Sequence, residues 1–257
     1  MSALGASHRE VKQLRRWIRD REARAADDVF VVEGPRALRS LLARGIAPRA
    51  IYRDARVAGD DEPGVRTVEA GVLERVSDTR TSQGVIAVFA RPSANDVRAA
   101  IDSAGFVVVL SRVNDPGNLG TVARSAQAAG ADAIVVGPGS VDPYNPKAVR
   151  AGAGAIGSLP VWAANEEAEV REMLDEVAVR GGVRLGAVAA GAVGIDAAPF
   201  AVRPLAVVFG HETAGLAPLP LDATFAIPMA DGSESLNLAM AATITCFEVA
   251  RRRRGEG

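Results

Sequence analysis

The sequence of 257 residues contains very few of the residues that form disulfide bonds and metal sites. Its single cysteine, Cys246, has no partner for an internal disulfide, and two histidines, His8 and His211, are too few for a conventional zinc site. Cys246 lies within an apolar helical pattern, so we interpret it as a small core residue. We therefore expect a protein without a metal centre.

Aromatic residues and long apolar runs are also scarce. Phe, Trp and Tyr make up 4% of the chain, which argues against a stacking platform for single-stranded nucleic acid. No run of about 20 apolar residues occurs, and the first 20 residues contain no apolar core of a signal peptide. We expect a cytoplasmic enzyme or binding protein with no membrane segment.

What the sequence does contain is typical of a globular α/β protein. It is 48% hydrophobic and 24% charged, and its formal net charge is -1. The length allows one large domain or two ordinary ones. The near-zero charge argues against a histone-like polycation, but it leaves room for a local basic face.

The pattern of apolar segments divides the chain near residue 95, which predicts domains at 1–95 and 96–257. In the first part, an amphipathic helix is expected over 8–25 and a second helix over 36–45. Strands are expected there at 29–34, 50–55 and 84–90, and residues 91–102 read as a linker that leads into a short helix.

Continuous apolar strands separated by helices dominate the second part. The expected strands are 106–111, 132–137, 159–163, 183–190, 204–210 and 225–229. This arrangement predicts a mostly parallel sheet that is covered on both faces. Since ligands of such sheets bind at the carboxyl ends of the strands, the informative segments are 112–124, 210–216 and 228–237.

The first of these segments lacks both of the glycine spacings that cradle phosphates, G-x-G-x-x-G and G-x-x-x-x-G-K-[ST]. Pro116 and Gly117 predict a turn, and Asn118 is expected to cap the helix that follows. Arg124 lies away from the apolar stripe of this helix. It is either a solvated surface arginine or a guanidinium that faces a ligand at the sheet edge.

The second segment places polar residues directly after an apolar strand. Gly210 would allow a ligand to approach the backbone, and Glu212 would lie at the mouth of the sheet. Glu212 also fits a helix N-terminus, where the dipole favours a carboxylate. We favour His211 as a polar loop residue over a general base.

The third segment leads into a long final helix, expected from about Ser235. Ser233 or Ser235 would cap this helix, and Asn237 would lie in its first turn. An apolar stripe follows, which is typical of core or of a subunit interface; it comprises Leu236, Met240, Ile244 and Phe247. The terminal arginines, residues 251–254, complement the helix dipole, and we favour that role over RNA contact because the run is terminal and expected to be mobile.

Taken together, the three segments resemble the three motifs of the SpoU/TrmH family of RNA ribose 2'-O-methyltransferases in the SPOUT superfamily. The matching stretches are "NDPGNLGTVARSAQAAGA", "VVFGHETAGL" and "IPMADGSESLNLAMAATITCFEVARR". "VDPYNPKAVRAGAGAIGSLPV" also resembles this family. "FVVEGPRALRSLLARG" and "VSDTRTSQGVIAVF" resemble its ribosomal-protein-L30e-like substrate-binding domain.

The resemblance implies an N-terminal L30e-like α/β domain and a C-terminal SPOUT domain with a deep trefoil knot. It implies S-adenosylmethionine in the knot, a homodimer through the C-terminal domain, and an RNA substrate. The implied catalytic set is Arg124, Asn118, Glu212, Ser235 and Asn237. The implied cofactor-binding set is Phe209, Gly210, Ile227, Met229, Ser235 and Leu236. Because a guanidinium is always protonated, we interpret Arg124 as a stabiliser of the developing oxyanion and not as a base.

The substrate is expected to be structured RNA, and ribosomal RNA is favoured over tRNA. Cations of the first part would bind its phosphates, with Arg150 as a further candidate; they include Arg15, Arg16, Arg36 and Arg80, with Arg19, Arg21, Arg24 and Arg39 nearby. Each of these residues, taken alone, could equally belong to a solvated basic face without contacting RNA. The alternatives are a catalytically silent RNA-binding protein on the same fold and a dinucleotide-dependent oxidoreductase, although the sequence lacks the fingerprint of the latter.

Overall fold

The computed structural model describes residues 3–58, 64–77, 82–190, 193–211, 215–231 and 235–255. The chain forms two compact units. The first comprises Met1–Arg91 and Tyr144–Ser158, and the second comprises Pro92–Pro143 and Leu159–Gly257. The predicted domains, 1–95 and 96–257, remain a prediction, and the compact units differ from them by placing 144–158 in the first unit.

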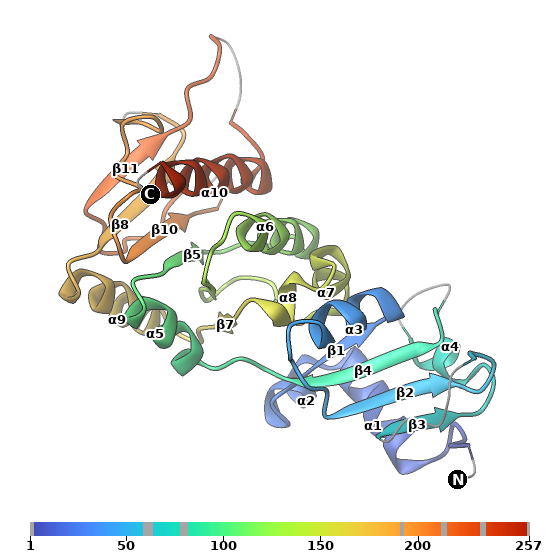
Figure 1. The fold of residues 1–257 in the computed structure, drawn as a ribbon. Helices are drawn as coiled ribbons and strands as arrows, with labels where there is room; N and C mark the ends of the chain where they lie inside the picture. Colours follow the sequence, from blue (N-terminus) through green and yellow to red (C-terminus); the bar gives the residue numbers. More distant parts are fainter. Residues whose placement is uncertain are drawn as a thin grey trace. The chain divides into compact units, whose positions relative to one another are not determined.

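The first unit is built around a mixed sheet with the strand order β1-β4-β2-β3 (Figure 1). Strands β1 and β2 run antiparallel to β4, and β3 runs parallel to β2. Its elements are α1 (Arg9–Arg19), α2 (Arg21–Ala26), β1 (Val29–Glu33), α3 (Pro35–Leu42), β2 (Ala50–Asp54), β3 (Val65–Val68), α4 (Val72–Val76), β4 (Val85–Ala90), α7 (Pro146–Gly152) and α8 (Ala155–Ser158).

One expected helix of this unit is two helices in the structure. The segment 8–25 was predicted as a single helix, but α1 ends at Arg19 and α2 begins at Arg21. Asp20 adopts extended backbone angles between them, and its side chain accepts hydrogen bonds from the backbone N–H groups of Glu22 and Ala23. The prediction was wrong because the carboxylate of Asp20 caps a new helix at this point.

The second unit contains a seven-stranded sheet with the order β7-β6-β5-β10-β8-β11-β9, and every strand pair in it is parallel. This confirms the predicted α/β class and the parallel sheet; the trefoil knot remains a prediction. The elements are α5 (Ala94–Asp102), β5 (Phe106–Leu110), α6 (Pro116–Ala128), β6 (Ala133–Val136), β7 (Val161–Ala163), α9 (Glu167–Val179), β8 (Val183–Val188), β9 (Val193–Gly194), β10 (Leu205–Phe209), β11 (Ala223–Ala226) and α10 (Leu238–Arg254).

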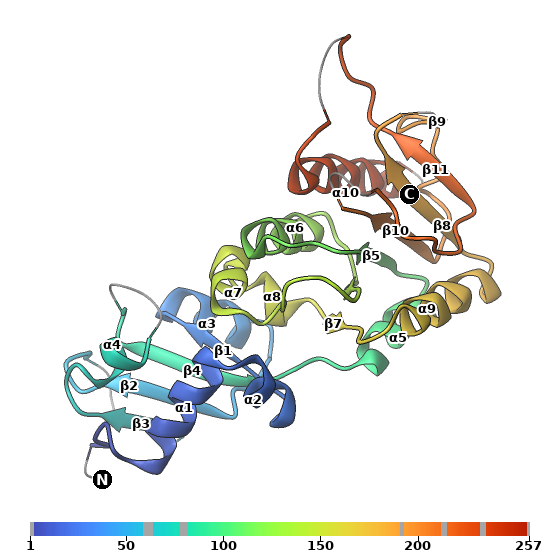
Figure 2. The ribbon, with the colours of Figure 1, turned by 180° about the vertical axis from the view of Figure 1, so that it is seen from behind.

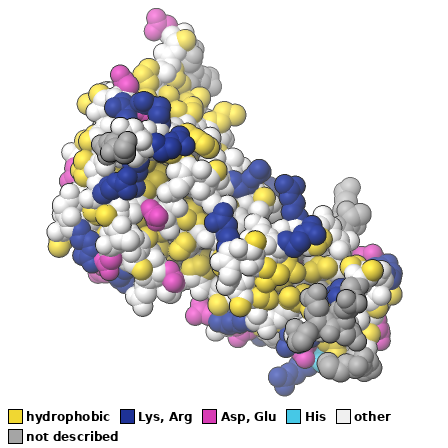
Figure 3. Space-filling view, viewed as in Figure 1, with side chains coloured by type: hydrophobic (Ala, Val, Ile, Leu, Met, Phe, Trp, Pro, Cys, Tyr) yellow, Lys and Arg dark blue, Asp and Glu magenta, His cyan; other side chains and the backbone are white. Residues whose placement is uncertain are grey.

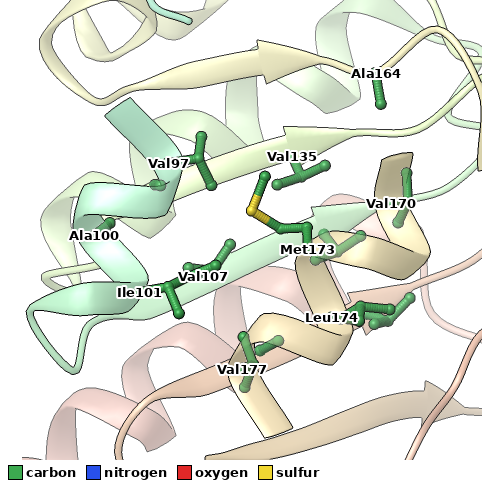
Figure 4. Packing of buried hydrophobic residues seen from close by; sticks show 14 residues of the cluster. Val97, Ala100, Ile101, Val107, Val135, Ala164, Val170, Met173, Leu174 and Val177 are labelled. Carbon is green, nitrogen blue, oxygen red and sulfur yellow. The ribbon is translucent and has the colours of Figure 1, made fainter. Parts of the chain in front are cut away.

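Helices cover both faces of the parallel sheet at its centre, where β5, β6 and β10 are buried throughout. Figure 4 shows α5 and α9 packed on one face, where Val97, Ile101, Met173 and Leu174 contact alternate residues of the central strands such as Val107. Helices α6 and α10 lie against each other on the opposite face (Figures 1 and 2). The hydroxyls of Ser125 and Thr243 are 2.7 Å apart where the two helices meet.

The buried face of helix α10 is not the face that carries Met240, Ile244 and Phe247. The buried residues are Leu238, Ala239, Ala242, Thr245, Cys246, Val249 and Ala250. Cys246 is therefore a core residue, and burial raises the pKa of its thiol to about 12. Met240, Ile244 and Phe247 of the predicted stripe are exposed, which excludes the core alternative for them; the subunit-interface alternative remains a prediction. Burial on this helix follows the small residues because they allow close packing against α6.

The terminal arginines, residues 251–254, form the last turn of α10, although we expected them to be mobile. Arg251 and Arg252 hydrogen-bond to the Glu248 carboxylate, which lowers the pKa of Glu248 to about 2. Arg252 also donates to the backbone carbonyl of Asp196, and Arg253 donates to that of Val202. These bonds anchor the end of the helix to the segment before β10.

Candidate functional site

The first loop of the site joins β5 to α6 and carries a different cap from the predicted one. The Asp115 side chain accepts a hydrogen bond of 2.7 Å from the Gly117 N–H, and Pro116 occupies the first helical position. Asn118 was predicted to be this cap, but it lies within the first turn. Since the cap is supplied by Asp115, the Asn118 amide is not needed for that role and lies half-buried near the third loop.

The second loop follows β10 and contains a close backbone contact at Gly210. A Cβ atom on Gly210 would lie 2.2 Å from the carbonyl oxygen of Gly215, so only glycine fits there. His211 and Gly215 exchange backbone hydrogen bonds of 3.0 and 2.9 Å. Glu212, predicted as a catalytic residue, lies outside the residues that the structure describes.

The third loop follows β11 and ends at the cap of α10. The backbone N–H of Ala239 donates to the Oδ1 atom of Asn237 over 2.9 Å, so Asn237 is the cap. Ser235 was predicted as a cap and lies two residues before Asn237, exposed, while Ser233 falls outside the described residues. Asn237 was expected in the first turn, but the helix begins at Leu238.

A cavity of about 280 Å³ lies at the second and third loops and the end of β8, at the carboxyl ends of the strands. All six residues of the predicted cofactor set line it, from Phe209 and Gly210 to Leu236. The full lining consists of Ala187, Val188, Ala189, Phe209, Gly210, His211, Gly215, Leu216, Phe225, Ile227, Met229, Ser235, Leu236, Leu238 and Ala241. The walls are mostly apolar side chains and loop backbone, which suits a ligand with both apolar and hydrogen-bonding parts.

Sequence reasoning missed one wall of this cavity. Ala187, Val188 and Ala189 lie at the end of β8, a strand whose following segment carries no polar signal. Their position after a parallel strand was the only indication available, and small apolar residues alone do not distinguish a cavity wall from core.

Two side-chain hydrogen bonds connect the first loop to the other two. The Nδ2 atom of Asn114 lies 3.2 Å from Nε2 of His211, which lines the cavity. The Nδ2 atom of Asn237 donates to Oδ1 of Asn118 over 3.3 Å. The three loops that the sequence singled out therefore form one site, and Asn114 joins it although it was not predicted.

Arg124 lies on α6, less than two turns beyond Asn118, and is exposed. No ion pair or hydrogen bond links its guanidinium to another residue in the described part of the chain. An exposed guanidinium that is not committed to a carboxylate can bind an anionic oxygen of a ligand.

The predicted RNA-binding cations lie in the first unit. Arg15, Arg16 and Arg36 are exposed, and Arg150 on α7 is half-buried; Arg80 lies outside the described residues. Arg24 is buried at 3% exposure and donates hydrogen bonds to the carbonyls of Trp17 and Ile18, which excludes it from a phosphate-binding surface.

Within the described residues, no helix is long and apolar enough to cross a membrane. The same part of the chain contains no cluster of three or more His, Cys, Asp or Glu residues that could hold a metal ion.

Sequence comparison assigns both parts of the chain. Residues 105–247, more than half of the protein, match the SpoU rRNA Methylase family, and residues 8–87 match the MRM3-like substrate binding domain. The chain belongs to the SpoU rRNA Methylase family. This confirms the predicted family, and the matched region contains all three loops of the site.

Several SpoU relatives are similar over nearly their whole length. The 23S rRNA (guanosine(2553)-2'-O)-methyltransferase RlmP of Bacillus subtilis is 29% identical over 95% of this chain and 97% of its own. The 23S rRNA (uridine(2479)-2'-O)-methyltransferase of Streptomyces viridochromogenes is 29% identical over 91% of this chain and 86% of its own. A further similar structure is the crystal structure of the SpoU methyltransferase AviRb from S. viridochromogenes in complex with AdoMet. Its TM-score is 0.82 at 27% identity, and the match covers 96% of this chain and 100% of the AviRb chain.

Proposed function

We propose that this chain transfers a methyl group from S-adenosylmethionine to a ribose 2'-hydroxyl of ribosomal RNA. The observation that carries the proposal is the cavity at the second and third loops, which all six predicted cofactor residues line. The relatives named above support it, because two are named as 23S rRNA 2'-O-methyltransferases and the crystal structure of AviRb is a complex with AdoMet.

The residues of the cavity fit this cofactor. Apolar side chains such as Phe209, Ile227 and Leu236 would cover its adenosine and methylene groups, and the backbone at Gly210 would hydrogen-bond its polar edges. When bound, S-adenosylmethionine supplies a methyl group that is activated by a positively charged sulfur. The loops must hold this methyl group in line with the ribose oxygen that attacks it.

Arg124 would act on the ribose side of the reaction. The new bond joins the 2'-oxygen to the methyl carbon while the sulfur–carbon bond breaks, and the proton of the 2'-hydroxyl passes to water or to a phosphate oxygen of the RNA. A guanidinium cannot accept that proton, but it can stabilise the negative charge that develops on the oxygen. Asn118 and Asn237, joined by their hydrogen bond, would position the substrate beside it; Ser235 and Glu212 complete the predicted set.

We further propose that the protein works as a homodimer through α10. The exposed stripe of Met240, Ile244 and Phe247 places three large apolar side chains on one face of that helix. Since the stripe follows directly on the third loop, a second copy bound there would lie beside the cavity.

The proposed activity is tested with Arg124→Ala, Arg124→Lys and, as a control, Arg254→Ala, which removes another exposed arginine of the same unit. We expect Arg124→Ala to lower the rate of methyl transfer to deproteinised ribosomal RNA by about 10²-fold or more, the usual effect of removing one oxyanion donor. Arg124→Lys should retain part of the rate, and the control should retain all of it.

Cofactor binding by calorimetry should be unchanged in all three variants, because Arg124 does not line the cavity. An Arg124→Ala variant with the normal rate would contradict the proposed role of this residue. A wild-type protein that binds the cofactor but methylates neither ribosomal RNA nor tRNA would instead be a silent RNA-binding protein.

A further inference from the structure

Residues 144–158 pack against one face of the sheet of the first unit. On one face of this sheet, α1 and α4 pack against Val29, Val31, Ile86 and Val88. The alternate residues face the other side, where the Phe30 ring lies 5.4 Å from that of Phe89 and 5.3 Å from that of Tyr144. Helices α3 and α7 contact the sheet, and α8 packs against both of these helices.

The fit of this segment against the first unit is close. A Cβ atom on Gly157 would lie 2.4 Å from the Phe30 ring, and one on Gly154 would lie 3.1 Å from the Oγ atom of Ser40 in α3. The Arg91 guanidinium lies 4.7 Å from the centre of the Tyr144 ring. Figures 1 and 2 both show α7 and α8 beside α3. The segment is therefore part of the first unit, although the matched SpoU region, 105–247, includes it and the matched substrate-binding domain ends at residue 87.

The second side of the sheet differs from the first in charge. Helices α3, α7 and α8 contain Arg36, Arg39, Lys147 and Arg150 and no carboxylate. Figure 3 shows Lys and Arg side chains over the position of α3 and α7. Arg36, Arg39 and Lys147 are exposed, and neither Arg36 nor Arg39 forms an ion pair within the described residues.

Carboxylates accompany the cations on the side of α1. Arg16 lies 3.8 Å from Asp20, and Arg66 forms an ion pair of 2.5 Å with Glu10. Asp27 accepts hydrogen bonds from the side chains of Gln13 and Trp17. Because phosphates are repelled by nearby carboxylates, the layer of α3 and α7 attracts a polyanion more strongly than the layer of α1.

We propose that the RNA backbone docks on a composite basic face of the first unit, formed by Arg36 and Arg39 of α3 together with Lys147 and Arg150 of α7. Residues 144–158 then belong functionally to substrate binding. The proposal rests on the proposed function only in taking ribosomal RNA as the substrate. It also divides the predicted cations, since Arg36 and Arg150 lie on the docking layer while Arg15 and Arg16 lie on the opposite one.

Charge reversals on the two layers of the full-length protein test this proposal. Arg36→Glu with Arg39→Glu reverses two exposed arginines of α3, and the matched control, Arg15→Glu with Arg19→Glu, reverses two exposed arginines of α1. Lys147→Glu tests α7 separately. Binding of deproteinised 23S rRNA is measured over a range of salt concentrations, and circular dichroism and cofactor calorimetry verify that each variant is folded.

We expect the α3 pair to bind the RNA about tenfold more weakly or worse, with a salt dependence reduced by about two phosphate contacts. Lys147→Glu should reduce the salt dependence by about one contact, and the α1 pair should bind like wild type. Equal or greater loss in the α1 pair, or normal binding by the α3 pair, would overturn the proposal. Failure of the proposed function looks different, because wild type itself would then bind its cofactor without methylating the RNA.

Discussion

At the scale of single residues, Asn237 combines a structural and a chemical role in one amide. Its Oδ1 atom accepts the N–H of Ala239 and so begins α10, while its Nδ2 atom donates to Asn118. Because the oxygen is fixed by the cap, the orientation of the amide is also fixed. The start of the last helix and the alignment of the first loop are therefore set by the same side chain.

Two substitutions at Asn237 separate these roles. Asn237→Ala removes both bonds and should lower the free energy of unfolding by about 1 kcal/mol, the usual cost of a lost cap. Asn237→Ser keeps a capping oxygen but loses the amide donor. Its free energy of unfolding should therefore equal that of wild type, while its rate of methyl transfer should be lower than that of wild type. Chemical denaturation and a methyl-transfer assay on both variants give the measurement.

The outcome discriminates between the two roles. If Asn237→Ser recovers both stability and rate, the residue acts only as a helix cap and its bond to Asn118 has no part in the reaction. A cofactor affinity that is unchanged in Asn237→Ser would assign the lost rate to the ribose side of the site.

At the scale of secondary-structure elements, α10 presents large apolar side chains to solvent and small ones to the core. Phe247 is 45% exposed and Met240 is 61% exposed, whereas Ala242 and Cys246 are fully buried. Leaving several large side chains of one helix face in water is unusual unless a partner covers them. The element therefore has the composition of an interface on one side and of a helix–helix contact on the other.

We expect Ile244→Glu to convert the proposed dimer into a monomer, because an unpaired carboxylate at the centre of an apolar interface is strongly unfavourable. Light scattering coupled to gel filtration gives the mass. Val179→Glu is the control, since Val179 is an exposed apolar residue of α9, outside the stripe. A wild-type monomer, or a dimer that persists in Ile244→Glu, would contradict the assignment of α10 as the interface.

Elements that could be predicted from the sequence are those whose pattern reflects burial alone. Strands such as β5 and β10 are continuous apolar runs, and their positions were correct within one residue. Strand β3, helix α4 and the two-residue β9 were missed because they are too short to show a period. Caps were predicted two to four residues from the true ones, since several neighbouring Ser, Asn and Asp side chains could serve and only the backbone path selects among them.

The same limit explains which parts of the site could be predicted. Its loops were located because they follow parallel strands, and the residue set within them came from the family resemblance. The bond between Asn114 and His211 joins residues 97 positions apart, and no local pattern encodes such a pairing. Likewise, the apolar stripe of α10 was recognised, but periodicity does not say whether a stripe faces its own chain or another.

At the scale of the whole molecule, the net charge of -1 is the sum of two units of opposite charge. The first unit, residues 1–91 and 144–158, contains 19 Lys and Arg against 13 Asp and Glu, for a net charge of +6. The second unit contains 11 against 18, for a net charge of -7. Long-range attraction of RNA is therefore concentrated on the unit that matches a substrate-binding domain.

The chain also passes between the units three times, after residues 91, 143 and 158. A segment enclosed by strands of the parallel sheet thus supplies one layer of the other unit. Tyr144 is 1% exposed and its ring contacts Phe30, so its removal leaves a cavity in the first unit. The loss of a large buried aromatic side chain typically costs about 3–5 kcal/mol.

We therefore expect Tyr144→Ala to destabilise the first unit selectively, even though residue 144 lies between strands β6 and β7 of the second. Hydrogen exchange followed by mass spectrometry should show faster exchange in β1 and β4 and unchanged exchange in β5 and β10. Met173→Ala, which opens a cavity in the core shown in Figure 4, should give the reverse pattern. If Tyr144→Ala instead loosened β5 and β6, residues 144–158 would be energetically part of the catalytic unit, and the basic face would not be a single composite surface.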